Sequence, residues 1–310
     1  MNRESLRDAY GTALVESGRE HSSVVVLDAD LSKSTRTTLF EKEFPDRFFE
    51  MGIAEQNMIS TAAGLSIAGK IPFVNTFAVF AAGRGYDQIR QSICIPRLNV
   101  KICGSSAGLS DYGDGSTHQA IDDIAIMRAL PNMMVLAPSD SVETALMVNE
   151  MVRYDGPVYM RISRSLLPVY TEANEDYSIH TPSLLREGRD IIIFANGSMI
   201  EKAFDAAEML ADKGISLRIV NVSKIKPMDR QALIPFVKNM KGIITAEEHS
   251  LIGGMGAAVL YALRNDINMP VKMIGVNDRF GTSSDNVEEL MYEYGLTKEV
   301  IINAAEEITA

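Results

Sequence analysis

The sequence predicts an α/β protein with two domains, each built on a doubly wound and mostly parallel sheet. Short apolar runs rich in β-branched residues alternate with helical patterns along the first half of the chain. The alternation stops at a polar segment with two prolines and then starts again. Such alternation is typical of parallel sheets covered by helices on both faces. A chain of 310 residues has room for two domains of ordinary size.

The first half contains five apolar runs that predict strands, at residues 23–27, 71–77, 98–103, 133–137 and 157–162. A helical stretch at 56–68 precedes the second run, and Pro138, Ser139 and Asp140 predict a helix start after the fourth. A shorter strand-like stretch ends at Gly52. We expect these elements to form a first domain over residues 1–166.

The second half repeats the pattern after a predicted interdomain linker at 167–187, which carries Pro168 and Pro182. Apolar runs at 190–195, 217–222, 241–246 and 271–275 predict four strands. A helix follows the first of them, and Gly214 is its expected stop. These elements predict a second domain over residues 188–310.

The composition argues against several partners. The net charge of −11 disfavours a nucleic-acid backbone or an anionic membrane. The charged N-terminal residues do not resemble a signal peptide, and no apolar run is long enough to span a bilayer. The two cysteines are too few for a disulfide framework or a zinc site. We therefore expect a cytoplasmic enzyme that binds neither nucleic acid nor membrane.

Glu55 is the most informative residue, because it lies where an apolar stretch ends and a helix begins. In an α/β protein this is where a cofactor meets the chain. Taken alone, Glu55 also fits a structural role: with Gly52 as N-cap it resembles half a capping box, and the helix dipole favours an acid in a first turn.

Polar residues gather behind several predicted strands. If the strands are parallel, these side chains share one edge of the sheet, where α/β proteins bind ligands. The turn at 113–119 brings Asp114 and His118 to this edge, and an imidazole suits proton transfer near neutral pH. The other candidates are Asp28, Asp30, Ser32, Ser34, Glu55, Phe77, Phe80, Ser105, Ser106, Asp111 and Arg164.

Four motifs together resemble the transketolase family of thiamine-diphosphate enzymes. They are Met-Gly-Ile-Ala-Glu-Gln-Asn at 51–57, Asn-Thr-Phe at 75–77, Asp-Gly-Ser-Thr-His-Gln at 114–119 and Leu-Pro-Asn-Met-Met-Val-Leu-Ala-Pro-Ser-Asp at 130–140. The resemblance covers nearly the whole chain, as a pyrimidine-binding domain followed by the family's C-terminal domain. It implies transfer of a two-carbon ketol unit from a ketose phosphate to an aldose.

The resemblance also implies roles toward thiamine diphosphate. Glu55 would hydrogen-bond the aminopyrimidine and promote the tautomer that activates the thiazolium, which is the electron sink for C–C cleavage. Phe80 and Phe77 resemble the aromatic residues that stack on and enclose the pyrimidine. Asp30 resembles an aspartate near the thiazolium, and His118 a histidine that contacts the cofactor-bound intermediate.

Further residues resemble the family's substrate-binding groups. Arg7 and Arg164 fall where two arginines bind substrate phosphate, and Ser34 resembles a phosphate-binding serine. Asp114 resembles an aspartate that binds a substrate hydroxyl. Two departures, Ser106 in place of a histidine and Gly83 in place of an aromatic residue, indicate that the substrate differs from the common pentose phosphates.

The family holds the diphosphate and Mg²⁺ in another domain, through a Gly-Asp-Gly motif followed by an asparagine. The Gly-Asp-Gly at 113–115 is not that motif, because no asparagine stands at the expected separation. We therefore expect an N-terminal partner subunit that binds the diphosphate and supplies most of the Mg²⁺ ligands, in an α2β2 assembly. A fragment of a longer enzyme is the alternative, which the Met1 start disfavours.

Two other functions remain open. The β subunit of a 2-oxo-acid dehydrogenase E1 shares the Gly-Ile-Ala-Glu-Gln signature and the α2β2 assembly, although the 114–119 turn and Arg164 favour a sugar phosphate. A regulatory subunit that kept the fold without catalysis is the third hypothesis, and retention of Glu55 and His118 argues against it. The Gly253–Gly256 segment is only a weak match to a dinucleotide-binding motif. The Glu247–His249 segment is only a weak candidate for a metal site, because no further ligands cluster nearby in the sequence.

Overall fold

Two parallel sheets organise the chain in the computed structural model, which describes residues 2–172 and 181–310. The first sheet has the strand order β12-β6-β7-β5-β4-β2-β3, and all of its neighbours pair in parallel except β12 and β6. Its strands are β2 (Val24–Asp28), β3 (Phe48–Glu50), β4 (Ile71–Phe77), β5 (Lys101–Ser105), β6 (Met134–Leu136), β7 (Val158–Ile162) and β12 (Lys224–Lys226). The predicted fold class is confirmed.

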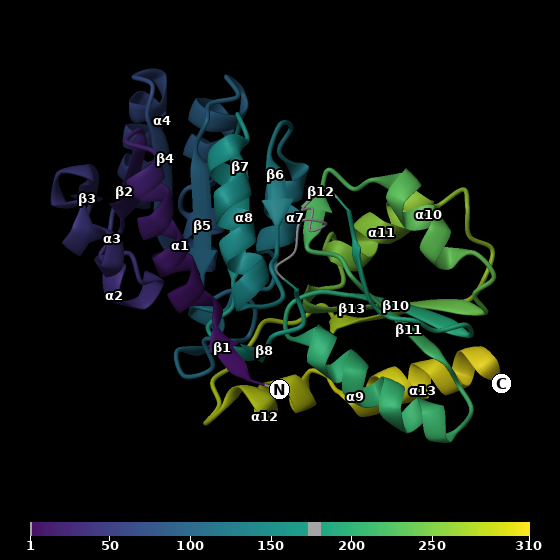
Figure 1. The fold of residues 1–310 in the computed structure, drawn as a ribbon. Helices are drawn as coiled ribbons and strands as arrows, with labels where there is room; N and C mark the ends of the chain where they lie inside the picture. Colours follow the sequence, from purple (N-terminus) through teal and green to yellow (C-terminus); the bar gives the residue numbers. More distant parts are fainter. Residues whose placement is uncertain (1, 173–180) are drawn as a thin grey trace.

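Helices cover both faces of this sheet, as Figure 1 shows. Alternate residues of β2 point to opposite faces: Val24 and Val26 pack in a cluster with α1 and α8, whereas Val25 and Leu27 pack in a cluster with α4 and α7. The helices are α1 (Leu6–Glu20), α2 (Ser32–Thr35), α3 (Thr38–Glu43), α4 (Glu55–Ile67), α5 (Ala78–Gly83), α6 (Tyr86–Gln88), α7 (Asp123–Ala129) and α8 (Ser141–Arg153), with a π-helical turn at Ile89–Cys94.

The second sheet has the order β14-β13-β10-β11-β9, and only β9 is antiparallel to its neighbour. Helices α10 and α11 lie on one face and α9 and α13 on the other (Figure 1). The elements are β9 (Ser183–Arg186), β10 (Ile191–Ala195), α9 (Met199–Asp212), β11 (Leu217–Asn221), α10 (Arg230–Val237), β13 (Gly242–Ser250), α11 (Met255–Leu263), β14 (Val271–Val276), α12 (Val287–Glu293) and α13 (Lys298–Thr309). Gly214 follows α9 with φ +76°, as expected for its stop.

The two halves are joined more closely than the sequence predicted. Strand β12 comes from the second half but pairs antiparallel with β6 at the edge of the first sheet. One apolar cluster continues from Leu27 of β2 to Phe194 of β10. The pairing and the shared core fix how the second half sits against the first.

The predicted linker carries strands at both ends. Strand β8 (Leu166–Pro168) pairs antiparallel with β1 (Arg3–Ser5), and β9 lies at the edge of the second sheet. Residues 173–180, in the middle of this segment, lie outside the described residues. The domain limits at 166 and 188 therefore stay predictions.

Candidate active site

The Glu55 side chain lies at the first residue of α4 and is only 5% exposed. Its Oε1 accepts a hydrogen bond from Arg84 Nη1 at 2.9 Å. The residue preceding the helix is Ala54, which makes no side-chain cap, so the expectation that Gly52 is the N-cap was wrong. The carboxylate therefore does not complete a capping box, although its place in the first turn still suits the helix dipole.

An aromatic wall stands next to this carboxylate. The Phe77 and Phe80 rings are stacked at 18° with centroids 6.0 Å apart, and the His118 ring meets them edge-on at 6.2 and 5.3 Å. The Arg84 guanidinium lies 4.1 Å from the centre of the Phe80 ring. Through Arg84, the structure thus connects Glu55 to three residues that the sequence predicted for the same site. A buried carboxylate beside flat rings is a fitting receptor for a nitrogen-containing aromatic ring.

The loop after β2 reaches the same edge of the sheet. Asp30 has φ +60°, and its N–H donates to Glu50 Oε1 at 2.8 Å. The same oxygen accepts from the N–H of Gly52 at 2.9 Å, so Glu50 ties the ends of β2 and β3 together. The Asp30 side chain is exposed, and no described contact connects it to Glu55.

Asp28 supports this loop from within the sheet. Its carboxylate accepts hydrogen bonds from Leu31 N, Thr35 Oγ1 and Thr37 Oγ1 at 2.7 to 2.8 Å. Burial raises the pKa of Asp28 to about 6 in spite of these bonds. Asp28 is therefore a structural residue that fixes the Asp30 loop.

Arg7 and Arg164 form a second group. Arg7 Nη1 donates to the main-chain carbonyl oxygen of Ser34 at 3.0 Å, so these two residues predicted for the substrate site lie next to each other. Arg164 Nη1 pairs with Asp111 Oδ1 at 2.8 Å, and the Asp111 side chain is only 1% exposed. The sequence placed Asp111 at this edge without assigning it a partner.

The turn at 113–119 lies between the Glu55 group and the Arg7–Arg164 group. A hydrogen bond to Thr282, in the second half of the chain, holds this turn in place. The pKa of Asp111 is raised, first by burial and then by Asp114, whereas Arg164 and His118 lower it. Gln119 Nε2 donates to Thr282 O at 2.9 Å. Asp114 itself is exposed and accessible to a ligand.

A cavity of about 320 Å³ opens beside Arg7 and Arg164, between the two halves. Neither Glu55 nor His118 lines it. Its other walls come from both halves and include Arg3, Ser110, Tyr112, Leu167, Ser198, Glu201, Lys202, Glu248 and Glu288.

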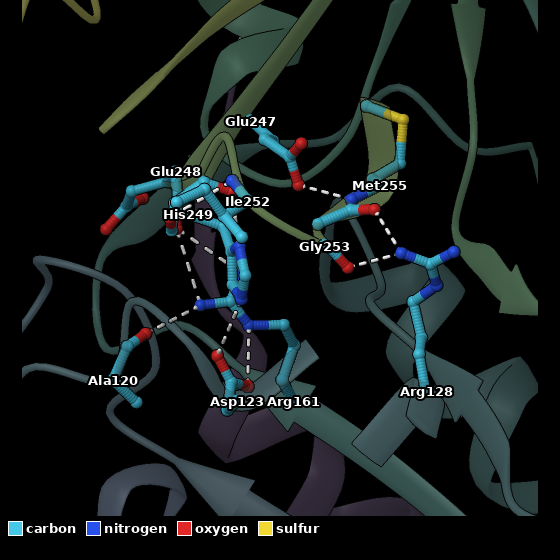
Figure 2. A network of polar contacts seen from close by, with 12 residues as sticks. Ala120, Asp123, Arg128, Arg161, Glu247, Glu248, His249, Ile252, Gly253 and Met255 are labelled. Atoms are coloured by element: carbon cyan, nitrogen blue, oxygen red, sulfur yellow. Dashed lines mark hydrogen bonds and ion pairs between the residues drawn. The ribbon is translucent and has the colours of Figure 1, made fainter. Parts of the chain in front are cut away.

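A buried polar network joins β7 of the first sheet to β13 of the second (Figure 2). Arg161 pairs with Asp123 at 3.1 Å and donates to the carbonyl oxygens of Ala120 and Glu248. His249 Nε2 lies 3.9 Å from Asp123 Oδ1, and both side chains are fully buried. The sequence did not connect these residues, because they come from β7, α7 and β13.

The Gly253–Gly256 segment has a structural role. The Glu247 carboxylate accepts from the N–H groups of Met255 and Gly256 at 2.5 and 2.8 Å, as Figure 2 shows for Met255. The chain's own acid thus occupies the start of α11, where an anionic ligand would otherwise bind.

Among the described residues, no three His, Cys, Asp or Glu side chains lie close enough to hold a metal ion. The helices in the described part of the chain are all too short or too polar to cross a membrane.

Comparison with known proteins places this architecture in the class of thiamine-diphosphate-dependent enzymes. The model of the transketolase pyrimidine-binding domain matches residues 3–169, and that of the transketolase C-terminal domain matches residues 182–301. The chain therefore belongs to the transketolase family.

Relatives of similar length support this assignment. A putative transketolase C-terminal section from Methanocaldococcus jannaschii is 43% identical, over 96% of this chain and 94% of the relative. A 6-deoxy-6-sulfo-D-fructose transketolase subunit from Clostridium sp. is 38% identical, over 98% and 94%. A solved structure described as a split gene transketolase, inactive beta4 tetramer, superposes with a TM-score of 0.88 at 46% identity, over 99% of this chain and 98% of that one. The chain is thus similar, over nearly its whole length, to a transketolase C-terminal section, to a transketolase subunit and to a split gene transketolase.

Proposed function

We propose that this chain is the C-terminal subunit of a two-chain enzyme that transfers a two-carbon ketol unit from a ketose to an aldose. The observation that carries the proposal is the buried Glu55 carboxylate beside the Phe77–Phe80–His118 wall. One relative named as a putative transketolase C-terminal section and another named as a transketolase subunit support the same reaction. The sequence resemblance favours a ketose phosphate as donor.

Glu55, Phe80, Phe77 and Asp30 are the residues that would hold thiamine diphosphate. Bound there, the cofactor would supply a nucleophilic carbon and an electron sink for C–C cleavage. The Glu55 carboxylate would hold a proton at a pyrimidine nitrogen, in a dry pocket where such a hydrogen bond is strong. The two rings would bind the flat face of the pyrimidine and exclude water.

His118 and Asp114 would act on the substrate. The His118 imidazole stands edge-on to the aromatic wall and suits proton transfer to or from a substrate hydroxyl. Asp114 would accept a hydrogen bond from another hydroxyl. Arg7, Ser34 and Arg164 would bind the far end of the sugar.

A partner subunit would complete the site. The diphosphate and Mg²⁺ would be bound mainly by an N-terminal transketolase subunit, in an α2β2 assembly in the cytoplasm. The split-gene relative, whose own description names an inactive tetramer of one subunit type, supports the need for a second chain.

The test is to co-express the chain with the N-terminal transketolase subunit of the same genome and assay it with thiamine diphosphate and Mg²⁺. We expect ketol transfer by the pair and none by either chain alone. Replacement Glu55→Gln should abolish transfer while the assembly still forms. Decarboxylation of 2-oxo acids without transfer would favour the dehydrogenase alternative, and unchanged activity of Glu55→Gln would favour a regulatory subunit.

A further inference from the structure

The environment of Arg164 bears on the charge of the substrate. Arg164 is one of two arginines at the site proposed above for the far end of the sugar, and it forms an ion pair with Asp111. The Asp111 carboxylate is 1% exposed, whereas the Arg164 side chain is 45% exposed. Asp111 thus lies behind Arg164, where solvent screens its charge little.

The neighbouring cations are neutralised in a similar way. Arg36 Nε pairs with Asp8 Oδ1 at 2.7 Å. Burial lowers the pKa of Arg7, and the nearby charges of Arg164 and Arg36 lower it further. Arg7 and Arg164 line the same cavity, and because Asp111 pairs with Arg164 the two arginines and this carboxylate carry one net positive charge.

Arg7 supplies that charge. Among the described residues no carboxylate lies within ion-pairing distance of Arg7, and its described hydrogen bond goes to a neutral carbonyl oxygen. Arg7 also lines the cavity between the two halves, together with Arg164.

The rest of the cavity wall adds no positive charge. Arg3 pairs with Glu201, and Lys202 pairs with Glu288 at 2.8 Å. Glu248 contributes a further carboxyl group, which accepts hydrogen bonds from Ser198 and from the N–H of Leu109. A doubly charged group would therefore meet little compensating charge here.

We propose that the far end of the sugar carries at most one negative charge, and that Asp111 determines this specificity. A hydroxyl or a sulfonate end fits the single uncompensated charge on Arg7, whereas the dianion of a phosphate ester is repelled by the buried Asp111. This inference rests on the proposed ketol transfer and narrows its substrate class to sugars without a terminal phosphate.

The activity test compares acceptor sugars in the assembled enzyme. We expect D-ribose to be used with at least about tenfold higher kcat/KM than D-ribose 5-phosphate. Asp111→Asn keeps an oxygen for Arg164 but removes the charge, so it should shift this ratio about tenfold toward the phosphate ester. Asp212→Asn is the control, because Asp212 is exposed at the last residue of α9 and does not line the cavity; the ratio should stay unchanged.

Two outcomes would overturn the inference. One is a wild-type enzyme that prefers the phosphate ester tenfold. The other is an Asp111→Asn variant that loses activity equally on both sugars, since that result would make Asp111 only a support for Arg164.

A binding test separates this inference from the proposed function. Methyl phosphate and methanesulfonate have similar shapes, but at pH 8 the first is mainly a dianion and the second a monoanion. Saturation-transfer NMR on the full chain should show tighter binding of methanesulfonate by wild type and a gain for methyl phosphate in Asp111→Asn. Absence of ketol transfer by the assembly would defeat the proposed function, whereas tighter binding of methyl phosphate by wild type would defeat the charge inference.

Discussion

Arg84 Nη1 donates to Glu55 Oε1 at 2.9 Å while its guanidinium carbon lies over the Phe80 ring, 4.1 Å from the ring centre. One side chain thus contacts both the proposed proton-holding carboxylate and the proposed pyrimidine platform. Arg84 is itself half exposed, with 50% of its side-chain surface accessible. We infer that it positions Glu55 relative to Phe80.

Replacing Arg84 with methionine should therefore impair the assembled enzyme. We expect kcat/KM to fall about tenfold or more, because a small misplacement of a catalytic group has effects of this size. Arg84→Lys should restore part of the loss, since an ammonium pairs with Glu55 but does not lie flat on a ring. Calorimetric titration of thiamine diphosphate should show weaker binding by Arg84→Met. The exposed Arg90, replaced in the same way, is the control and should behave as wild type.

The strands were predictable because their apolar runs are short, β-branched and separated by helical patterns. The run at 71–77 coincides with β4, and the run at 190–195 differs from β10 by one residue. The run at 98–103 was placed too early, since β5 begins at Lys101. Lys101 is fully buried, and its ammonium donates to two carbonyl oxygens. The sequence alone did not predict that a strand begins at this residue, because a lysine is seldom fully buried.

The contacts of the site were less predictable than its location. Parallel strands bring their carboxyl ends to one edge, which was enough to place Phe80 and His118 together. The Arg84–Glu55 pair depends on how α5 and α4 pack, and no local pattern reports that packing. Strand β12 was missed because it has only three residues, two of them lysines, and its pairing partner lies in the other half.

Gly254 is required at the start of α11 because a Cβ there would overlap the Glu247 carboxylate. Gly254→Ala should lower the free energy of unfolding by about 2 kcal/mol, the usual size for overpacking. Urea denaturation followed by circular dichroism measures it, since the chain has no tryptophan. Gly64→Ala is the control: it lies in α4 with open space around it and should gain up to about 1 kcal/mol. Equal effects of the two substitutions would contradict the role given to Glu247.

Lys226 of β12 joins the two halves at the C-terminal end of α7. Its ammonium donates to the carbonyl oxygens of Arg128 and Leu130, which a helix end leaves without intrahelical partners. Lys226→Met should cost about 1 to 2 kcal/mol in urea denaturation, because the carbonyls lose a charged donor. Lys272→Met removes an exposed ion pair with Glu307 and should change stability by less than about 0.5 kcal/mol. A Lys226→Met variant as stable as this control would show that the contact is dispensable.

The buried His249 should make stability depend on pH. Its Nδ1 faces the carbonyl oxygen of Ser250 at 2.8 Å, and because a carbonyl only accepts, Nδ1 carries the proton of the neutral ring. Burial lowers the pKa of His249 to about 4, although the nearby Asp123 opposes the shift. The unfolded chain binds a proton near pH 6.5 and the folded one does not, so stability falls as the pH drops from about 6.5 to about 4.

The loss from His249 amounts to at most about 3 kcal/mol, and it can be isolated by comparing wild type with His249→Asn. Asparagine keeps a donor for Ser250 but does not titrate, so the stability advantage of wild type should shrink as the pH falls through this window. Burial raises the pKa of Asp28 to about 6 and that of Glu247 to about 7, so these two carboxyl groups make the folded chain more stable as the pH falls. Because both groups are present in wild type and in His249→Asn, their effect cancels in the difference between the two proteins. His21→Asn, at an exposed position, should run parallel to wild type. A difference between wild type and His249→Asn that stays constant from pH 7 to pH 4 would mean that His249 takes up its proton at the same pH in the folded and the unfolded chain, and would contradict the lowering of its pKa by burial.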